Sequence, residues 1–348
     1  MVTDWKKILL PPHVNAEKAL QVLDEGGLRL VMVVDDTLKL LGTLTDGDIR
    51  RALLRHVDIS KSSVADIMHS TPRTAFVGSS REQIRRQMEM HSLLHIPLID
   101  SEGTLQGLEI YQEPTAQRLR DNWVFLMAGG FGKRLKPLTD HCPKPMLQVG
   151  GKPMLQTILE GFIAAGFHRF CISVHYLPET IKNHFGDGSK WDVTIVYVEE
   201  DQPLGTGGAL GLLPDTGSLP VIMMNGDILT KLDFNALLDF HESQQAELTL
   251  CVREYDMQVP FGVVEGNGST VLGITEKPQH RFFVNAGIYV VTQAAIARTI
   301  PARRVDMPDL IKEIIADQRQ VSMFPIREYW LDIGRPEDFD TAQQSIHN

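Results

Sequence analysis

The chain has 348 residues, of which 43% are hydrophobic and 22% are charged, and its formal net charge at pH 7 is −10. A chain of this length favours two domains, since a single hydrophobic core rarely grows beyond about 250–300 residues. The acidic net charge argues against a nucleic-acid partner. The sequence contains no apolar run of about 18 residues, the length that a membrane-spanning helix needs.

Three cysteines, Cys142, Cys171 and Cys251, are scattered along the chain without metal-ligand spacing. A small, odd number of cysteines is typical of a reducing compartment and argues against a disulfide framework. The N-terminus, Met1–Lys7, lacks the basic-then-apolar pattern of a signal peptide. We therefore expect a cytoplasmic protein without a membrane partner.

The first third of the chain contains an internal repeat. When the sequence is shifted by 65 positions, residues 15–48 align with residues 80–113 without a gap. Each copy has a predicted helix, an apolar strand, an acidic turn and a second short strand. The predicted helices and first strands are Ala16–Asp24 with Leu30–Val34, and Arg81–His91 with His95–Ile99. Two copies of such a unit usually pack together and bury what each exposes alone.

The first copy ends in a Gly-x-x-Thr-x-x-Asp pattern that includes Thr45 and Asp48 and leads into a helical stretch, Arg50–Arg55. This pattern resembles a CBS domain, and residues 1–118 resemble a tandem CBS (βαββα) pair. The resemblance implies that Asp48 binds the ribose hydroxyls of an adenine nucleotide, AMP or ATP, and that Thr45 contacts its phosphate or ribose.

The second copy has Ile110 and Glu113 at the equivalent positions, so we expect one competent nucleotide site at most. An alternative interpretation is structural, because Thr and Asp are common at helix N-termini. Thr45 and Asp48 would then only cap the helix that follows.

Residues 112–122 are polar and contain one proline, a composition typical of a linker. After it, apolar strands alternate with helices, the signature of a parallel α/β sheet. For residues 122–348 we expect a Rossmann-like α/β domain with a mixed, mainly parallel sheet. The apolar run Trp123–Met127 predicts a buried parallel strand. It leads into Ala128–Gly132, a turn of small residues whose successive N–H groups could bind an anion.

The glycine-rich turn matches neither a Walker A sequence nor the dinucleotide-binding pattern. Together with Pro143–Leu147, however, Gly130–Thr139 resembles the signature of the nucleoside-diphosphate-sugar pyrophosphorylases, the sugar nucleotidyltransferase family. The resemblance holds along residues 122–348. It implies that a sugar-1-phosphate oxygen attacks the α-phosphorus of a nucleoside triphosphate and expels pyrophosphate.

Further segments carry the same resemblance in the same order. They are a second nucleotide loop at Glu199–Ala209, a first metal aspartate in Asn225–Asp227, sugar-binding segments at Glu276–Pro278 and Asn285–Gly287, and a second metal aspartate in Trp330–Gly334.

The resemblance also implies a role for each candidate residue. Two anions must meet, so the reaction needs Mg²⁺ and cationic side chains. Asp227 and Asp332 offer hard oxygen ligands to Mg²⁺. Arg134 would hold the triphosphate bidentately, and Lys144 would act on it as a point charge. The remaining nucleotide-binding candidates are Ala128, Gly129, Gly130, Gly132, Gly205 and Thr206, and the sugar-phosphate candidates are Lys277, Glu276 and Asn285.

Taken singly, each of these residues could equally be a solvated side chain or a turn cap. The Pro-Lys-Pro-Met run at 143–146 and the glycine-rich loop at 203–209 look more like the guanylyltransferase branch, which favours GTP. The fusion to a CBS pair resembles the guanylyltransferases that act on glucosamine-1-phosphate in legionaminic acid synthesis. Mannose-1-phosphate is the next candidate.

Two other functions remain open from the sequence. One is a uridylyltransferase or thymidylyltransferase of the same family, and the other is a non-catalytic nucleotide sensor. Because CBS pairs commonly dimerise, we expect a homo-oligomer in either case.

Overall fold

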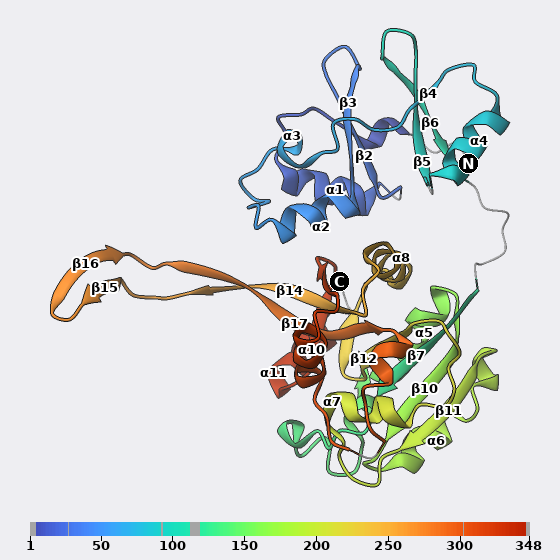
Figure 1. Ribbon diagram of the computed structural model, residues 1–348, viewed down its shortest axis with the longest axis vertical. Helices are drawn as coiled ribbons and strands as arrows, with labels where there is room; N and C mark the ends of the chain where they lie inside the picture. Colours follow the sequence, from blue (N-terminus) through green and yellow to red (C-terminus); the bar gives the residue numbers. More distant parts are fainter. Residues whose placement is uncertain (1–4, 27, 92, 112–118, 302, 346–348) are drawn as a thin grey trace. The chain divides into compact units, whose positions relative to one another are not determined.

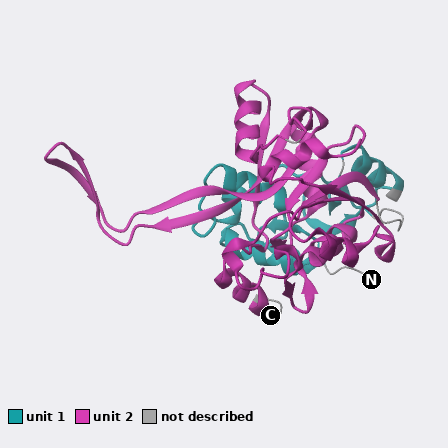
Figure 2. Cartoon of the chain, turned by 90° about the horizontal axis from the view of Figure 1, so that it is seen from below, with its two compact units in different colours: residues 1–116 teal, residues 117–348 magenta. Residues whose placement is uncertain are grey.

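The computed structural model describes residues 5–26, 28–91, 93–111, 119–301 and 303–345. It divides into two compact units, residues 1–116 and 117–348 (Figure 2). Every helix in the described part is too short or too polar to span a bilayer. The helices (Figure 1) are α1 (Ala16–Glu25), α2 (Asp46–Leu54), α3 (Val64–Ile67), α4 (Arg81–Met90), α5 (Met154–Ala164), α6 (Pro178–Phe185), α7 (Gly205–Gly208), α8 (Phe234–Gln244), α9 (Gln293–Ile296), α10 (Met307–Ala316) and α11 (Pro336–Ser345). The strands are β1 (Leu9–Leu10), β2 (Leu30–Val34), β3 (Leu40–Thr45), β4 (Ala75–Phe76), β5 (His95–Ile99), β6 (Leu105–Ile110), β7 (Arg120–Met127), β8 (Gln148–Val149), β9 (Lys152–Pro153), β10 (Phe167–Val174), β11 (Thr194–Glu199), β12 (Val221–Asn225), β13 (Ile228–Thr230), β14 (Leu248–Gln258), β15 (Val263–Asn267), β16 (Thr270–Thr275), β17 (Gln279–Val291), β18 (Val321–Ile326) and β19 (Trp330–Asp332).

The first unit contains the same small sheet twice. In β1-β2-β3 and in β4-β5-β6 the middle strand pairs in parallel with the first strand and antiparallel with the third. The registers agree as well: Leu10 pairs with Val33, and Ala75 pairs with Leu98 at the same 65-residue offset. The predicted internal repeat is therefore confirmed. Glu113 lies outside the described residues.

The helices of the two copies begin for the same physical reason. The side chain of Asn15 accepts a hydrogen bond from the amide of Glu17, and that of Ser80 accepts one from Gln83, so both N-termini are capped. The two sheets share a hydrophobic cluster of Ile8, Leu30, Met32, Val34 and Leu105. The two copies thus bury a common core, as the repeat predicts.

The second unit is built on a seven-stranded sheet with the order β11-β10-β7-β12-β17-β14-β18. All neighbouring pairs are parallel except those made by β17, which runs antiparallel to β12 and β14. Alternate side chains of β7 enter different cores: Val124 and Leu126 lie in one cluster and Phe125 in the other. The first cluster includes residues of α5, α6, α8 and α11, and the second includes residues of α10. The predicted mixed, mainly parallel sheet is confirmed.

The first strand of this sheet is longer than the sequence predicts. Residues 112–118 of the predicted linker lie outside the described residues, but Arg120–Asn122 belong to β7 rather than to a linker. Their polarity is compensated by specific partners. Arg120 Nε donates to Asn235 Oδ1 at 2.7 Å, and Asn122 Nδ2 donates to the carbonyl of Pro220 at 2.8 Å. Buried polar side chains with such partners are compatible with a strand.

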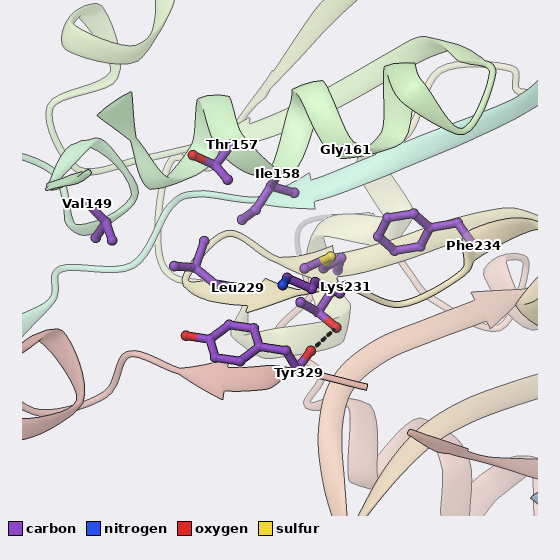
Figure 3. A pocket seen from close by; sticks show the side chains of 10 residues that line it. Val149, Thr157, Ile158, Gly161, Leu229, Lys231, Phe234 and Tyr329 are labelled. Atoms are coloured by element: carbon purple, nitrogen blue, oxygen red, sulfur yellow. Dashed lines mark hydrogen bonds between the residues drawn. The ribbon is translucent and has the colours of Figure 1, made fainter. Parts of the chain in front are cut away.

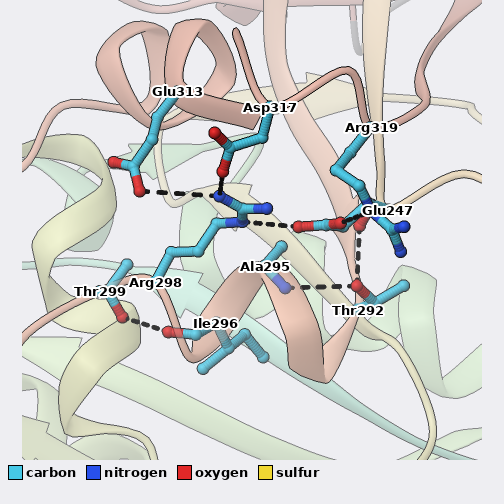
Figure 4. Close-up of polar contacts among 9 residues, drawn as sticks. All are labelled: Glu247, Thr292, Ala295, Ile296, Arg298, Thr299, Glu313, Asp317 and Arg319. Atoms are coloured by element: carbon cyan, nitrogen blue, oxygen red, sulfur yellow. Dashed lines mark hydrogen bonds and ion pairs between the residues drawn. The ribbon is translucent and has the colours of Figure 1, made fainter. Parts of the chain in front are cut away.

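Near the other edge of the sheet, a buried carboxylate holds three elements together (Figure 4). Glu247, directly before β14, accepts from Arg298 Nε at 2.7 Å and from Arg319 Nε at 2.8 Å. Burial raises the pKa of Glu247, but the hydrogen bonds from the two guanidinium groups outweigh it and hold the pKa below its usual range. Arg298 also pairs with Asp317 at 2.5 Å, which connects the end of α10 to the same network.

Strands β14 and β17 continue beyond the sheet as a two-stranded ribbon, which ends in the β15–β16 hairpin (Figure 1). Within the sheet, β14 also pairs with β18 as far as Arg253, and β17 also pairs with β12 from Ile288 onward. From Glu254 to Gln258, β14 pairs only with β17 among the described strands. We call residues 254–283 the arm.

Candidate active site

Two of the predicted segments lie side by side at one edge of the central sheet. Strands β7 and β12 are parallel neighbours, and the amide of Gly226 donates to the carbonyl of Met127 at 2.8 Å. The glycine-rich turn follows β7 and Asp227 follows β12, so both leave the sheet at neighbouring strand ends. Since the chain continues to β10 on one side of β7 and β12 lies on the other, this is the switch point where open α/β sheets bind ligands.

Asp332 is brought to Asp227 by the short strand pair β13–β19. Ile228 is the register partner of Asp332, and the amide of Ile333 donates to the carbonyl oxygen of Asp227 at 3.0 Å. The Asp332 side chain is exposed, yet enough protein surrounds its carboxyl group to change its protonation equilibrium. Desolvation, and then repulsion by Asp227, raise the pKa of Asp332, while Lys144 and Arg134 act in the opposite direction. The two predicted metal aspartates thus belong to one electrostatic cluster.

Lys144 forms an ion pair with this cluster. It lies in a 3₁₀ turn, Lys144–Met146, where it is buried, and its Nζ contacts Asp227 Oδ2. The other carboxylate oxygen, Asp227 Oδ1, is buried and has no hydrogen-bond partner in the described part of the chain. A buried carboxylate oxygen without a partner is costly unless it binds something, so this atom is available to a cation.

The donor set is suited to Mg²⁺. That ion is usually held by one or two carboxylates, with phosphate oxygens and water completing its shell. Asp227 and Asp332 supply two carboxylates, and the described residues contain no group of three or more His, Cys, Asp or Glu side chains that would make an all-protein cage.

Arg134 reaches the cluster from a second 3₁₀ turn, Lys133–Leu135, directly after the glycine-rich turn. Its guanidinium group lies against Gly334, where an added Cβ atom would be 3.5 Å from both terminal nitrogens. The Arg134 side chain remains exposed. The structure therefore brings together Arg134, Lys144, Asp227 and Asp332, which come from three separate parts of the sequence.

The glycine-rich turn is tightly packed on one side and open on the other. A Cβ atom on Gly129 would lie 2.9 Å from Glu200 Oε1, whereas one on Gly130 would meet nothing within 4 Å. Gly132 has φ of +60°, a conformation that favours glycine, and Thr139 Oγ1 donates to its carbonyl oxygen at 2.9 Å. Ala128 is buried at the end of β7. The open side of the turn is the part that a ligand could approach.

Glu200 connects the two predicted nucleotide loops, a role that the sequence motifs do not indicate. It is buried, its Oε2 accepts from the amide of Leu204 at 3.0 Å, and its Oε1 faces Gly129. Its position in the acidic start of the second loop was visible in the sequence, but an acidic residue in a loop is usually solvated.

Gly205 and Thr206 are held by the segment before α10. The amide of Thr206 donates to Asp306 Oδ1 at 3.0 Å, and Thr206 Oγ1 accepts from the amide of Met307 at 2.9 Å. Gly205 has φ of +79°, and a Cβ atom there would lie 2.5 Å from Asp306 Oδ1. These contacts fix the shape of the second loop, and Thr206 remains exposed beside them.

The predicted sugar-binding residues are divided between two places. Asn285 lies near the cluster, because it hydrogen-bonds to the amide of Gly287, and Gly287 packs on Asn225 next to Asp227. Glu276 and Lys277 lie instead in the arm, between β16 and β17, and both side chains are exposed. The strand from Gln279 to Asn285 separates them from the cluster by roughly 20 Å, at the usual rise of an extended chain. The structure does not bring Glu276 and Lys277 to the carboxylates of their own chain.

A cavity of about 360 Å³ lies between α5 and the β13 segment (Figure 3). It is lined mainly by apolar side chains, among them Ile158, Leu229 and Phe234, with Lys231 and Tyr329 at its wall. None of the predicted site residues lines it. A hexose phosphate needs polar partners for its hydroxyls, so this cavity does not resemble a sugar site.

In the first unit, Thr45 and Asp48 form a capping box at the start of α2. Asp48 Oδ2 accepts from the amide of Thr45 at 2.8 Å and from its hydroxyl at 2.6 Å. Asp48 Oδ1 pairs with Arg51 at 2.5 Å. The capping interpretation is thus realised in this structure. The same carboxylate is partly occupied by these contacts, and a nucleotide would have to share it or displace Arg51.

Two family models match the sequence. A model described as nucleotidyl transferase matches residues 124–348, and one described as CBS domain matches residues 4–55. The first covers most of the chain and includes all the predicted catalytic, nucleotide and metal residues. The second includes Thr45 and Asp48.

Among curated proteins, the chain is 36% identical over 223 residues to a mannose-1-phosphate guanylyltransferase of Mycobacterium tuberculosis, and the match covers 62% of the chain and 61% of the relative. It is 31% identical over 228 residues to a mannose-1-phosphate guanyltransferase of Schizosaccharomyces pombe, covering 63% of the chain and 62% of the relative. The chain thus spans less than two thirds of the length of these relatives.

Among solved structures, HddC from Yersinia pseudotuberculosis complexed with GMP-PN is similar, with 25% identity and a TM-score of 0.52 over 65% of the chain and 99% of that structure. A putative glucose-1-phosphate thymidylyltransferase from Bacillus anthracis, in complex with a sucrose, has 20% identity and the same TM-score over 65% of the chain and 95% of that structure. The latter likeness concerns the fold alone.

Proposed function

The chain belongs to the nucleotidyl transferase family, and on this basis we propose that it transfers a nucleoside monophosphate from a nucleoside triphosphate to a hexose-1-phosphate, releasing pyrophosphate. One observation carries the proposal: Arg134, Lys144, Asp227 and Asp332 converge beside the glycine-rich turn at the switch point of the sheet. The names of the curated relatives support GTP as donor and mannose-1-phosphate as acceptor. Glucosamine-1-phosphate remains the second acceptor, on the resemblance to CBS-fused guanylyltransferases.

The proposed step is a displacement at the α-phosphorus. A phosphate oxygen of the sugar-1-phosphate forms a bond to the α-phosphorus. The bond between the α-phosphorus and the oxygen that bridges it to the β-phosphorus breaks, and its electron pair leaves with pyrophosphate. The protein contributes position and charge neutralisation rather than a covalent intermediate. In our proposal Arg134 holds the triphosphate in a bidentate contact, and Lys144 orients Asp227 and adds positive charge beside the phosphates.

We assign Mg²⁺ to Asp227 and Asp332. When bound, the ion neutralises charge on the phosphate oxygens and lowers the repulsion between the two substrates. The buried, unpartnered Oδ1 of Asp227 supports the assignment. So does the raised pKa of Asp332, because burial and the charge of Asp227 both disfavour its ionised form, and a bound cation would offset them.

The glycine-rich turn is assigned to the nucleotide. Gly130 leaves open space above the backbone, while Gly129 and Glu200 fix the turn from below. The second loop, with Gly205 and Thr206, is assigned to the same ligand. Ala128 and Gly132 would shape the turn rather than contact the ligand through side chains.

For the first unit we propose that an adenine nucleotide, AMP or ATP, binds at Thr45 and Asp48 and modulates the transferase. The CBS domain model and the position of both residues at a helix N-terminus support this. We also propose that the protein is cytoplasmic, because three scattered cysteines are typical of a reducing compartment, and that it forms a homo-oligomer.

The test is a panel of GTP, ATP, UTP and dTTP against mannose-, glucosamine-, glucose- and N-acetylglucosamine-1-phosphate, with Mg²⁺, read by pyrophosphate release. We expect turnover with GTP and either mannose- or glucosamine-1-phosphate. Turnover only with UTP or dTTP would exclude the guanylyl assignment, and no turnover with any pair would refute the transferase.

A further inference from the structure

The arm is amphipathic, and its apolar face is uncovered. Tyr255 lies opposite Phe282 in the ribbon, and Met257 lies opposite His280. Residues that are opposite each other in an antiparallel pair project to the same face, as do residues two apart along a strand. These four side chains therefore share one face, and Tyr255 and Phe282 are 56% and 48% exposed.

The opposite face of the ribbon carries charged side chains that pair with one another, beside the partly buried Phe283, which lies opposite Glu254. Asp256 lies opposite Arg281, and Arg281 Nε donates to Asp256 Oδ1 at 2.8 Å. Arg281 also lies 3.8 Å from Glu254, the next charged residue on this face. A ribbon with one charged face and one apolar face has the pattern of a strand pair that is covered on one side.

The hairpin at the end of the arm also exposes apolar side chains. Val264 pairs with Ile274, and both are exposed, as are Leu272 and Phe261. The exposed apolar side chains of the whole arm are Tyr255, Met257, Phe261, Val264, Val271, Leu272, Ile274 and Phe282. Each of them exposes between 46% and 72% of its surface, and contiguous exposed apolar surface is typical of an interaction site. An isolated two-stranded ribbon is at best marginally stable in water, so this one requires a covering surface.

We infer that the covering surface is a second copy of this chain, and that the arm carries Glu276 and Lys277 to the carboxylate cluster of that copy. This inference rests on the proposed function. The sugar-phosphate must be held beside Asp227 and Asp332, yet the arm holds Lys277 away from these residues in its own chain. An identical cluster exists on a second copy, and a two-fold arrangement would give each arm one partner site.

The decisive experiment is complementation between two inactive variants. Asp227→Ala and Lys277→Ala are co-expressed with different affinity tags, and the mixed species is purified on both tags in succession. In the exchanged dimer, the chain with intact Asp227 receives the arm with intact Lys277, so one of the two sites is complete. We expect the mixed dimer to have about half the wild-type turnover, while each variant alone is inactive.

If wild-type protein is active but the mixed species is as inactive as each variant alone, Lys277 acts within its own chain and arm exchange is wrong, while the proposed function stands. If wild-type protein is inactive with every substrate pair, the proposed function fails. The covering of the arm by a second copy is then decided by a measurement that does not depend on activity.

That measurement is sedimentation velocity of the Tyr255→Ser/Phe282→Ser variant. We expect its dimer dissociation constant to rise at least tenfold over that of the wild type. Ile315→Ser is the matched control, because Ile315 is also 56% exposed but lies on α10 outside the arm. Circular dichroism verifies that both variants fold. A folded arm variant that dimerises like the wild type, or a wild-type protein that is monomeric, would overturn the inference.

Discussion

Asp227 and Asp332 are far apart in the sequence but adjacent in the structure, because the carbonyl oxygen of Asp227 accepts a hydrogen bond from the amide of Ile333 at 3.0 Å. The β13–β19 pairing fixes this relationship through the backbone, so it does not depend on either carboxylate. A substitution of one aspartate should therefore change the charge of the cluster while leaving the strand pair in place.

We predict that Asp227→Asn and Asp332→Asn each lower kcat by about 1000-fold or more, since each removes a proposed Mg²⁺ ligand of the charge-neutralising site. Asp332→Asn should keep the wild-type melting temperature within a few degrees, whereas Asp227→Asn should lower it, because the buried Lys144 loses its ionised partner. Binding of Mn²⁺ in the presence of GTP, measured by electron paramagnetic resonance, should weaken in both. Unchanged Mn²⁺ affinity in the two variants would reject the metal assignment even if activity falls.

The two neighbouring glycines of the turn should respond differently to a methyl group. In Gly129→Ala the Cβ atom would lie 2.9 Å from Glu200 Oε1, so we expect a loss of stability of about 1–3 kcal/mol. In Gly130→Ala the Cβ atom meets nothing within 4 Å, so the melting temperature should not change.

If the open side of the turn receives the nucleotide, Gly130→Ala should nevertheless raise KM for the triphosphate, since the methyl group would occupy the space of the ligand. Steady-state kinetics and thermal unfolding of the two variants measure the two effects separately. A Gly130→Ala enzyme with wild-type KM would indicate that the nucleotide does not lie over this turn.

Asp66, the capping residue of α3, provides a matched control for Asp48 at the proposed adenine-nucleotide site. Asp48 caps α2 and Asp66 caps α3 with the same geometry, since Asp66 Oδ2 accepts from the amide and hydroxyl of Ser63 at 2.8 and 2.7 Å. Asp48→Ala and Asp66→Ala should each cost about 1 kcal/mol of stability through the lost cap. Only Asp48→Ala should abolish AMP or ATP binding in calorimetry. Equal binding by both variants would leave Asp48 with a capping role alone.

His241 should make the second unit sensitive to acid. The side chain is buried, its Nδ1 lies 2.8 Å from Thr249 Oγ1, and burial lowers its pKa to about 4. The unfolded chain therefore binds a proton at a higher pH than the folded chain does. The stabilisation is complete above the unfolded pKa of 6.5 and is lost as the pH falls towards 4, by up to about 3 kcal/mol.

Urea unfolding at a series of pH values measures this effect. His241→Gln, which cannot titrate in this range and can still hydrogen-bond to Thr249, should lose less stability than the wild type between pH 6.5 and 4. Parallel pH profiles of the two proteins would show that His241 is not the group responsible.

Much of the fold could be predicted from the sequence, because local patterns determined it. The strands Leu30–Val34 and His95–Ile99 have the predicted bounds, since their apolar runs are limited by polar turns on both sides. The beginning of β7 could not be predicted in this way. Arg120 and Asn122 read as linker residues, and only their tertiary partners, Asn235 and Pro220, make them part of a strand.

In the candidate site, too, local motifs predict some residues, and tertiary contacts determine others. Asp227 and Lys144 were singled out by their motifs, and the structure pairs them. No motif indicates Glu200, because its role depends on burial between two loops that are separate in the sequence. The position of Lys277 in the arm also lies beyond sequence reasoning. A motif shows which side chain is present, whereas the course of a long strand pair determines where that side chain lies.

The most direct measurement of the central claim is the product formed by the wild-type enzyme and by Asp227→Asn from GTP, Mg²⁺ and mannose- or glucosamine-1-phosphate, identified by mass spectrometry. We predict that the wild type forms a GDP-hexose and pyrophosphate in equal amounts, and that Asp227→Asn forms neither above background. A wild-type enzyme that forms no nucleotide sugar, or an Asp227→Asn enzyme that forms it at the wild-type rate, would contradict the account.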